Sequence, residues 1–141
     1  MYINYVAVLV ASVLQFIFGA VWYGPIFGNL WGKMHGHDSI SKEEQARLMK
    51  GMAPYLAIQF VLTLVTTFVF ALLLNGIRAD WNIFGLAGFF WLGFMLPVQV
   101  SAVIFGQHVL ARQWISKKLA IMATASLVCI EIVAATLYLM H

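Results

Sequence analysis

Apolar residues fall into four long stretches along this chain, and polar residues gather in the short links between them. About 20 consecutive apolar residues are enough to cross the hydrocarbon core of a bilayer as an α-helix. The four stretches are Ile3–Tyr23, Ala53–Leu74, Ile83–Phe105 and Leu119–Met140. The pattern therefore predicts an all-α polytopic membrane protein, in which a bundle of four transmembrane helices forms a single domain over residues 1–141.

The first link, residues 24–52, is the only one long enough to hold a structural element of its own. Ser41, followed three residues later by Glu44, fits a capping box at the start of a helix. The link therefore predicts a short helix over Lys42–Lys50 that runs into the second span.

The first span ends in an aromatic and proline-containing segment. Pro25 fixes its own φ and disfavours the α conformation at Gly24, so we expect the first helix to end at about Tyr23. Aromatic rings with a polar edge prefer the headgroup level of a bilayer. We therefore interpret this segment as a structural exit motif that fixes the depth of the span. Its members are Trp22, Tyr23, Pro25 and Trp31.

A second proline interrupts the third span. Pro97 has no backbone N–H and leaves the carbonyl of Gly93 without its helical partner. The sequence therefore predicts a kink here. Membrane helices tolerate such kinks, so we interpret it as an ordinary kink rather than as a gate.

Composition excludes a soluble domain. The chain is 63% hydrophobic and 9% charged, and its mean hydropathy is +0.92, whereas a soluble domain carries about 25% charged residues. The net charge of +3 comes from scattered basic residues, which argues against a nucleic-acid partner. The single cysteine, Cys129, cannot form an intrachain disulfide, and no Cys/His spacing for a metal is present.

The distribution of Lys and Arg predicts the orientation. The links at residues 24–52 and 106–118 carry seven of these residues, and the link between the second and third spans carries one, Arg78. Basic residues concentrate in cytoplasmic loops. We therefore expect a multi-pass membrane protein with both termini outside and the two basic links in the cytoplasm. The seven are Lys33, Lys42, Arg47, Lys50, Arg112, Lys117 and Lys118.

Several polar side chains interrupt the apolar spans, and we treat them as candidates for binding a proton or a ligand. Counted from the span midpoints, one layer lies within about one helical turn of the midplane, and a second layer lies about one turn closer to the cytoplasm. The polar stripes of neighbouring spans are expected to converge. The first layer is Ser12, Thr66, Thr67, Trp91 and Glu131, and the second is Gln15, Gln59, Gln99 and Thr124.

Glu131 is the one acidic or basic residue within the four apolar stretches. Ionisable groups in a bilayer are rare and commonly functional. At helical spacing Glu131 shares a face with small residues, which allow close helix approach, so we expect it to point into protein. That face also carries Ala120, Thr124, Ala134, Ala135 and Tyr138. Trp91 needs a partner for its indole N–H at this depth, and we expect a carboxylate or a threonine.

One set of residues resembles a known family. Asn4, the pattern Gly19-x-x-Trp22-Tyr23-x-Pro25, and Trp31 are similar to the uncharacterised bacterial membrane family called domain of unknown function 1761. Gly88-x-x-Trp91-Leu92-Gly93-Phe94 fits the same family. The resemblance covers nearly the whole chain and implies an integral membrane protein with four spans, which we expect in the bacterial inner membrane. It brings no established activity, so no functional residues are carried over.

Three functions remain open on these patterns. One is a small proton-linked transporter or permeation pathway that uses Glu131. Another is a non-transporting scaffold or accessory subunit, in which the polar stripes only hold helices together. The third is a lipid- or quinone-binding protein that uses Trp91. A bundle of four helices is thin, so we expect a homo-oligomer in the lipid bilayer.

An enzyme is the weakest class, because no catalytic set of residues can be assembled. His35, His37 and His108 lie in the links, and no carboxylate or cysteine completes a metal-binding spacing. We therefore expect no metal and no cofactor.

Overall fold

The computed structural model describes residues 3–76, 82–104 and 112–140. Four of its helices are long and apolar enough to span a membrane, which confirms the predicted class. They cover Tyr5–Ile26, Ala53–Gly76, Ile83–Val103 and Trp114–Leu139. The fourth helix starts before the predicted Leu119, because the polar residues that precede it are helical too.

Short turns of other helix types join and interrupt the α-helices. Two of these turns, η1 and η3, are π-helical, and η2 is a 3₁₀-helix. In chain order the elements are α1 (Tyr5–Val21), η1 (Trp22–Ile26), α2 (Gly28–Met34), η2 (His37–Ser39), α3 (Lys42–Gly51), α4 (Ala53–Gly76), α5 (Ile83–Phe90), η3 (Trp91–Met95), α6 (Leu96–Ile104) and α7 (Arg112–Leu139).

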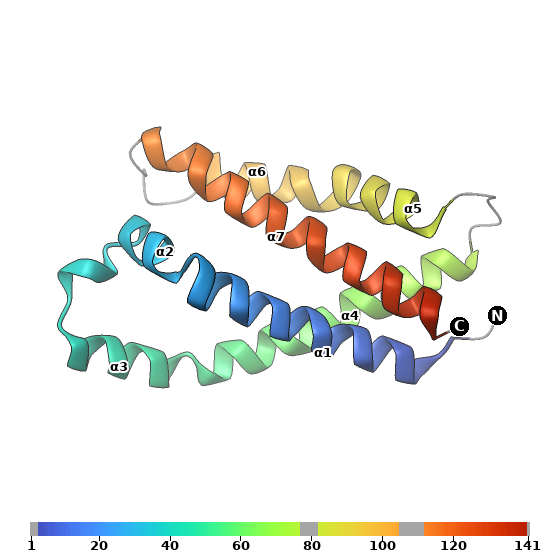
Figure 1. Ribbon diagram of the computed structural model, residues 1–141, viewed down its shortest axis with the longest axis horizontal. Helices are drawn as coiled ribbons and strands as arrows, with labels where there is room; N and C mark the ends of the chain where they lie inside the picture. Colours follow the sequence, from blue (N-terminus) through green and yellow to red (C-terminus); the bar gives the residue numbers. More distant parts are fainter. Residues whose placement is uncertain (1–2, 77–81, 105–111, 141) are drawn as a thin grey trace.

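The long helices run lengthwise beside one another, with both termini at one end and α2 and α3 at the other (Figure 1). Helix α7 packs against α1 on one side and against α5 and α6 on the other, while α4 packs against α1. The buried core contains residues of α1, α4, α5 and α7, and half of it comes from α7. Its members are Ala11, Phe70, Ala87, Ile130, Val133 and Ala134.

Side-chain caps define where two of the helices begin. The Asn4 side chain accepts a hydrogen bond from the Ala7 backbone N–H (3.1 Å), and its Nδ2 donates to the Met140 carbonyl (2.6 Å). This second bond ties the start of α1 to the end of α7. At the opposite end of the molecule, Ser41 caps α3 by accepting from the Glu44 N–H (3.3 Å). The predicted helix over Lys42–Lys50 is thus confirmed.

The prediction that the first helix ends at about Tyr23 is wrong, because only its α-helical part, α1, ends near there, at Val21, and the chain stays helical up to Ile26. The backbone continues through Pro25 as the π turn η1, in which the Phe27 N–H donates to the Trp22 carbonyl (3.0 Å). Proline removes an N–H and crowds the carbonyl four residues earlier, and a wider turn accommodates both effects. A second helix, α2, then follows inside the link at residues 24–52, where one helix alone had been predicted. Gly28 suits this junction, because a Cβ there would lie only 3.1 Å from the Tyr23 carbonyl oxygen.

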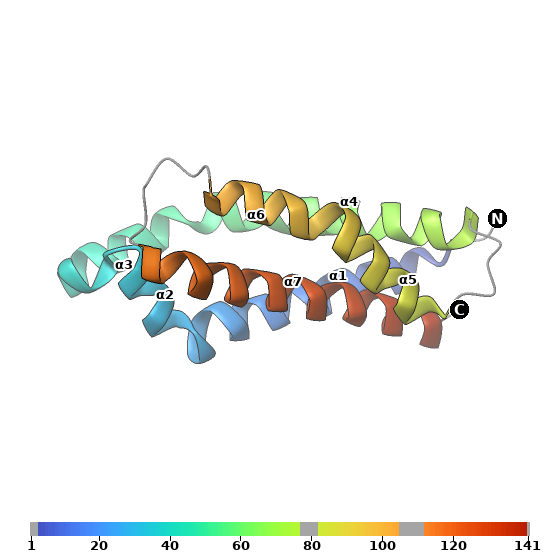
Figure 2. The same ribbon diagram turned by 90° about the horizontal axis from the view of Figure 1, so that it is seen from above.

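The predicted kink in the third span is confirmed and also takes the form of a π turn. Gly93 lies inside η3, and Pro97 follows within the first turn of α6. Figure 2 shows that α5 and α6 run in different directions on either side of this turn. The wider turn reduces the clash between the Pro97 ring and the Gly93 carbonyl.

Candidate functional site

The polar side chains of the spans form separate groups rather than one continuous layer. The first group joins α1 to α4. Gln15 Nε2 donates to the Thr67 hydroxyl (2.8 Å), and that hydroxyl donates to the Thr63 carbonyl of its own helix (2.8 Å). Thr67 is fully buried. The predicted contact between the polar stripes of the first two spans is thus found at this one pair of residues.

The second group joins the third span to α7 through a serine. Trp91 Nε1–H donates to the Ser126 hydroxyl (2.9 Å), which itself lies 3.2 Å from Gln99 Oε1 and 3.0 Å from the Ala123 carbonyl. The expectation of a carboxylate or threonine partner for Trp91 was wrong. The sequence analysis missed Ser126, because an isolated serine in a helix that is apolar all round gives no sign of which neighbour it faces.

Three other candidates do not join either group. The Ser12 hydroxyl is buried but donates to the Val8 carbonyl of its own helix (2.8 Å). The Thr66 hydroxyl likewise donates to the Leu62 carbonyl (2.9 Å). Thr66 and Gln59 are both exposed on the surface of α4. The Ser12 and Thr66 hydroxyls are thus satisfied within their own helices.

Glu131 stands apart from both groups. It is half-buried on α7, and its Oε1 would lie 3.9 Å from a Cβ placed at Gly88 of α5. Within the described part of the chain, its carboxyl group takes part in no hydrogen bond or ion pair. Glu131 is therefore a carboxyl at the edge of the α5–α7 contact, beside a glycine and without a polar partner.

The expectation that the small-residue face of α7 points into protein holds for only part of that face, where Ala134 is fully buried and Ala135 is half-buried. Ala120, Thr124 and Tyr138 on that face are exposed, and Tyr138 is 66% exposed. The buried side of α7 carries small and larger residues together, among them Ser126, Ile130 and Val133. Glu131 is half-buried, so it lies at the border between the buried and the exposed side of α7.

The exit motif forms an aromatic cluster that fastens the end of the first span to α7. Trp22 Nε1–H donates to the Ile121 carbonyl (3.2 Å). The Tyr23 and Trp31 rings lie 4.9 Å apart between centroids, and the Trp31 and His35 rings 4.7 Å. Trp22 therefore has the same role as Trp91: each opens a π turn and donates its indole N–H to α7.

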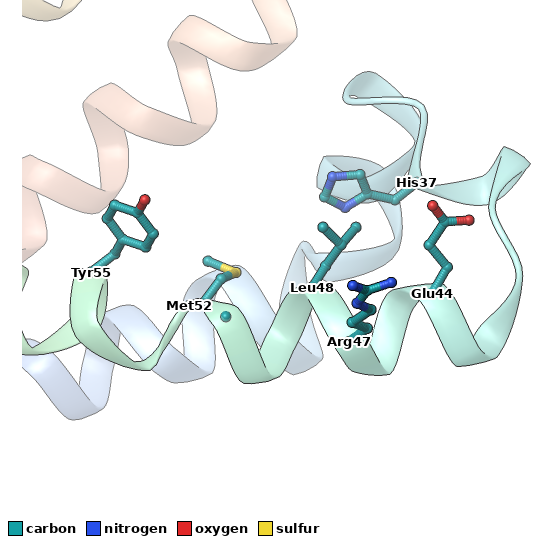
Figure 3. A pocket seen from close by; sticks show the side chains of 7 residues that line it. His37, Glu44, Arg47, Leu48, Met52 and Tyr55 are labelled. Atoms are coloured by element: carbon teal, nitrogen blue, oxygen red, sulfur yellow. The ribbon is translucent and has the colours of Figure 1, made fainter.

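A separate hollow of about 500 Å³ lies at the end of the molecule that carries α3. Figure 3 shows His37 and Glu44 toward one side of it and Tyr55 at the other. No cluster of three or more His, Cys, Asp or Glu side chains able to hold a metal occurs among residues 3–76, 82–104 and 112–140. Arg78, His108, Phe105 and the link at 106–111 lie outside the described residues.

The fold and these contacts define a multi-pass α-helical membrane protein. The family model described as "Protein of unknown function (DUF1761)" matches residues 6–138, nearly the whole chain, so the chain belongs to this family. No curated protein and no solved structure matched it.

Proposed function

We propose that this protein is a small proton-linked transporter or permeation pathway in which Glu131 binds and releases the proton. The observation that carries the proposal is the lack of any hydrogen-bond partner for this carboxyl in the described chain. Gln15, Thr67 and Trp91, by contrast, are paired across helices. A polar group that only held helices together would be expected to make such a bond.

The surroundings of Glu131 favour changes in how much water reaches its carboxyl group. Gly88 leaves room beside the carboxyl, and the π turn η3 begins three residues further along the same span. Such turns are frequent at functional sites. A change in the bend at η3 would alter the contact between α5 and Glu131. A dry carboxyl favours the neutral acid and a hydrated one the anion, so this movement would couple water access to proton binding.

The same geometry supports a homo-oligomer. Part of Glu131 lies at the surface of the single chain, on a stripe where Thr124 and Tyr138 are exposed. Placing a charged carboxylate in the bilayer core costs about 2.5 kcal/mol or more. A second copy packed over this stripe would shield the carboxyl from lipid, and the small residues would let the helices approach closely.

A scaffold or accessory subunit is the second candidate function. Two cross-helix hydrogen bonds, Gln15 to Thr67 and Trp91 to Ser126, favour it. Bonds of this kind contribute about 0.6 kcal/mol each to membrane helix packing. The third candidate, a lipid or quinone site at Trp91, is weaker, because Ser126 already accepts the indole N–H.

Infrared difference spectroscopy of the reconstituted protein tests the proposal without knowledge of a substrate. We expect the difference spectrum between high and low pH to contain the C=O band of a protonated carboxylic acid. The Glu131→Gln substitution should abolish this band. Glu43→Gln, on the exposed surface of α3, serves as the matched control and should keep the band. If the band is absent from the wild type or survives in Glu131→Gln, the carboxyl does not carry the proton and the scaffold function is favoured.

Flux across the membrane is the complementary measurement. Liposomes containing the protein and an internal pH dye should acidify faster than empty liposomes when a potassium diffusion potential draws protons inward. Glu131→Gln keeps the side-chain volume but cannot exchange a proton, so it should reduce this rate to the background. An unchanged rate would rule out a permeation pathway through Glu131.

A further inference from the structure

We propose that the end of the bundle opposite the termini carries a binding site for the phosphate of an anionic lipid headgroup. The site is formed by Lys117 and Lys118 of α7, Trp31 of α2 and His35, which directly follows α2. This site is separate from Glu131, which lies 13 residues further along α7, and does not depend on the function proposed above.

The ammonium of Lys118 is held in place from two sides. Its Nζ lies 3.3 Å from His35 Nε2 and 5.6 Å from the centroid of the Trp31 ring. His35 Nδ1 lies 2.8 Å from the Trp31 carbonyl oxygen. A neutral imidazole whose Nδ1–H donates to that carbonyl leaves Nε2 free to accept from Lys118. An ammonium has three N–H donors, and this arrangement uses one of them.

The positive charge at this site lacks an acidic partner. Lys117 Nζ lies 5.1 Å from the centroid of the Trp114 ring. Within the described ranges, neither Lys117 nor Lys118 forms an ion pair with a carboxylate. Contact with an aromatic face stabilises a cation but does not neutralise it. Two lysines that are neighbours in the sequence and have unused donors therefore suit a ligand that carries negative charge and several acceptor oxygens, such as a phosphate.

The place of these residues in the fold favours a lipid phosphate over a free one. Trp114 begins the fourth apolar helix, and Trp31 follows closely after the first, which ends at Ile26. The two lysines therefore stand where the spans leave the bilayer, at the level of the headgroups. Tryptophan rings are enriched at that level, and anionic lipids attract lysines next to a span. Acyl chains would lie along the apolar helices below.

Competition between two lipids with identical acyl chains tests the site. The full chain, purified in detergent, is mixed with equal amounts of phosphatidylglycerol and phosphatidylcholine, and native mass spectrometry counts the lipid retained. We expect the wild type to retain more phosphatidylglycerol. The double variant Lys117→Gln/Lys118→Gln should lose this preference by about five-fold or more, which corresponds to the attraction of at least one lysine.

Lys42→Gln/Lys50→Gln on α3 removes the same charge elsewhere and should keep the preference. An equal loss in this control would reveal general charge attraction and overturn the site. Equal retention of both lipids by the wild type would overturn it without any variant, so a variant that fails to fold does not block the test. Displacement of phosphatidylglycerol by millimolar inorganic phosphate would reassign the site to a free anion and overturn the lipid proposal.

Discussion

At the scale of single residues, two tryptophans connect the irregular parts of the fold to its central helix. Trp22 donates its indole N–H to the Ile121 carbonyl, and Trp91 donates to the Ser126 hydroxyl. Each tryptophan is the first residue of a π turn. A π turn widens the backbone locally, and a large side chain anchored on α7 holds the widened turn in one position.

The Trp91–Ser126 bond allows a direct test of this anchoring. Ser126→Ala removes the acceptor and leaves the indole N–H unpaired, so we expect a loss of about 1 kcal/mol in the free energy of unfolding. Unfolding by denaturing detergent in mixed micelles measures it, and Trp91→Phe completes a double-mutant cycle. Thr66→Val is the matched control, because Thr66 bonds only to its own helix on an exposed face. Equal losses in Ser126→Ala and Thr66→Val would contradict an anchoring role.

At the scale of secondary structure, the helices were predictable from the sequence, but the way they turn against one another was not. The length of the apolar stretch alone predicts spans such as α4. About 20 residues are needed to cross the hydrocarbon core, and a helix is the form in which a single segment pairs its own backbone N–H and C=O groups there. Pro25 and Pro97 indicated irregular backbone at the correct places. Whether such a place becomes an end, a kink or a π turn depends on what packs beside it, and that is a property of the whole fold.

The candidate site was less predictable than the helices, because it too depends on how the helices pack against one another. Gln15 and Thr67 meet because both lie on polar stripes of neighbouring spans. The side of α7 that faces the core could not be derived from the sequence. The helix carries apolar side chains on all sides, so no single apolar stripe marks the buried one. Its orientation follows from the packing of the whole bundle, which buries Ser126 and leaves Glu131 at an edge.

The π turn η1 leads to a prediction about Pro25. Pro25→Ala restores a backbone N–H that can donate to the carbonyl four residues earlier, so we expect the turn to convert to regular α-helix. Hydrogen exchange at residues 24–28 should then slow, and the changed direction of α2 should separate Trp31 from Lys118. Pro54→Ala in the first turn of α4 is the control, because a helix leaves its first N–H groups without partners in any case. Unchanged exchange in Pro25→Ala would show that packing against α7, rather than proline, sets the turn.

At the scale of the whole molecule, the start of α1 and the end of α7 lie at one end, and α3 and the start of α7, which carry basic residues, lie at the other (Figure 1). Lys and Arg in short loops resist translocation, so the end that carries α3 is expected to face the cytoplasm. Glu43 is exposed on α3, and Asn82 is exposed at the start of α5, at the opposite end. In a Cys129→Ser background, we expect a membrane-impermeant maleimide to label Asn82→Cys in intact cells and Glu43→Cys only after the membrane is opened. Labelling of Glu43→Cys in intact cells, with Asn82→Cys protected, would reverse the orientation and place Lys117 and Lys118 in the outer leaflet.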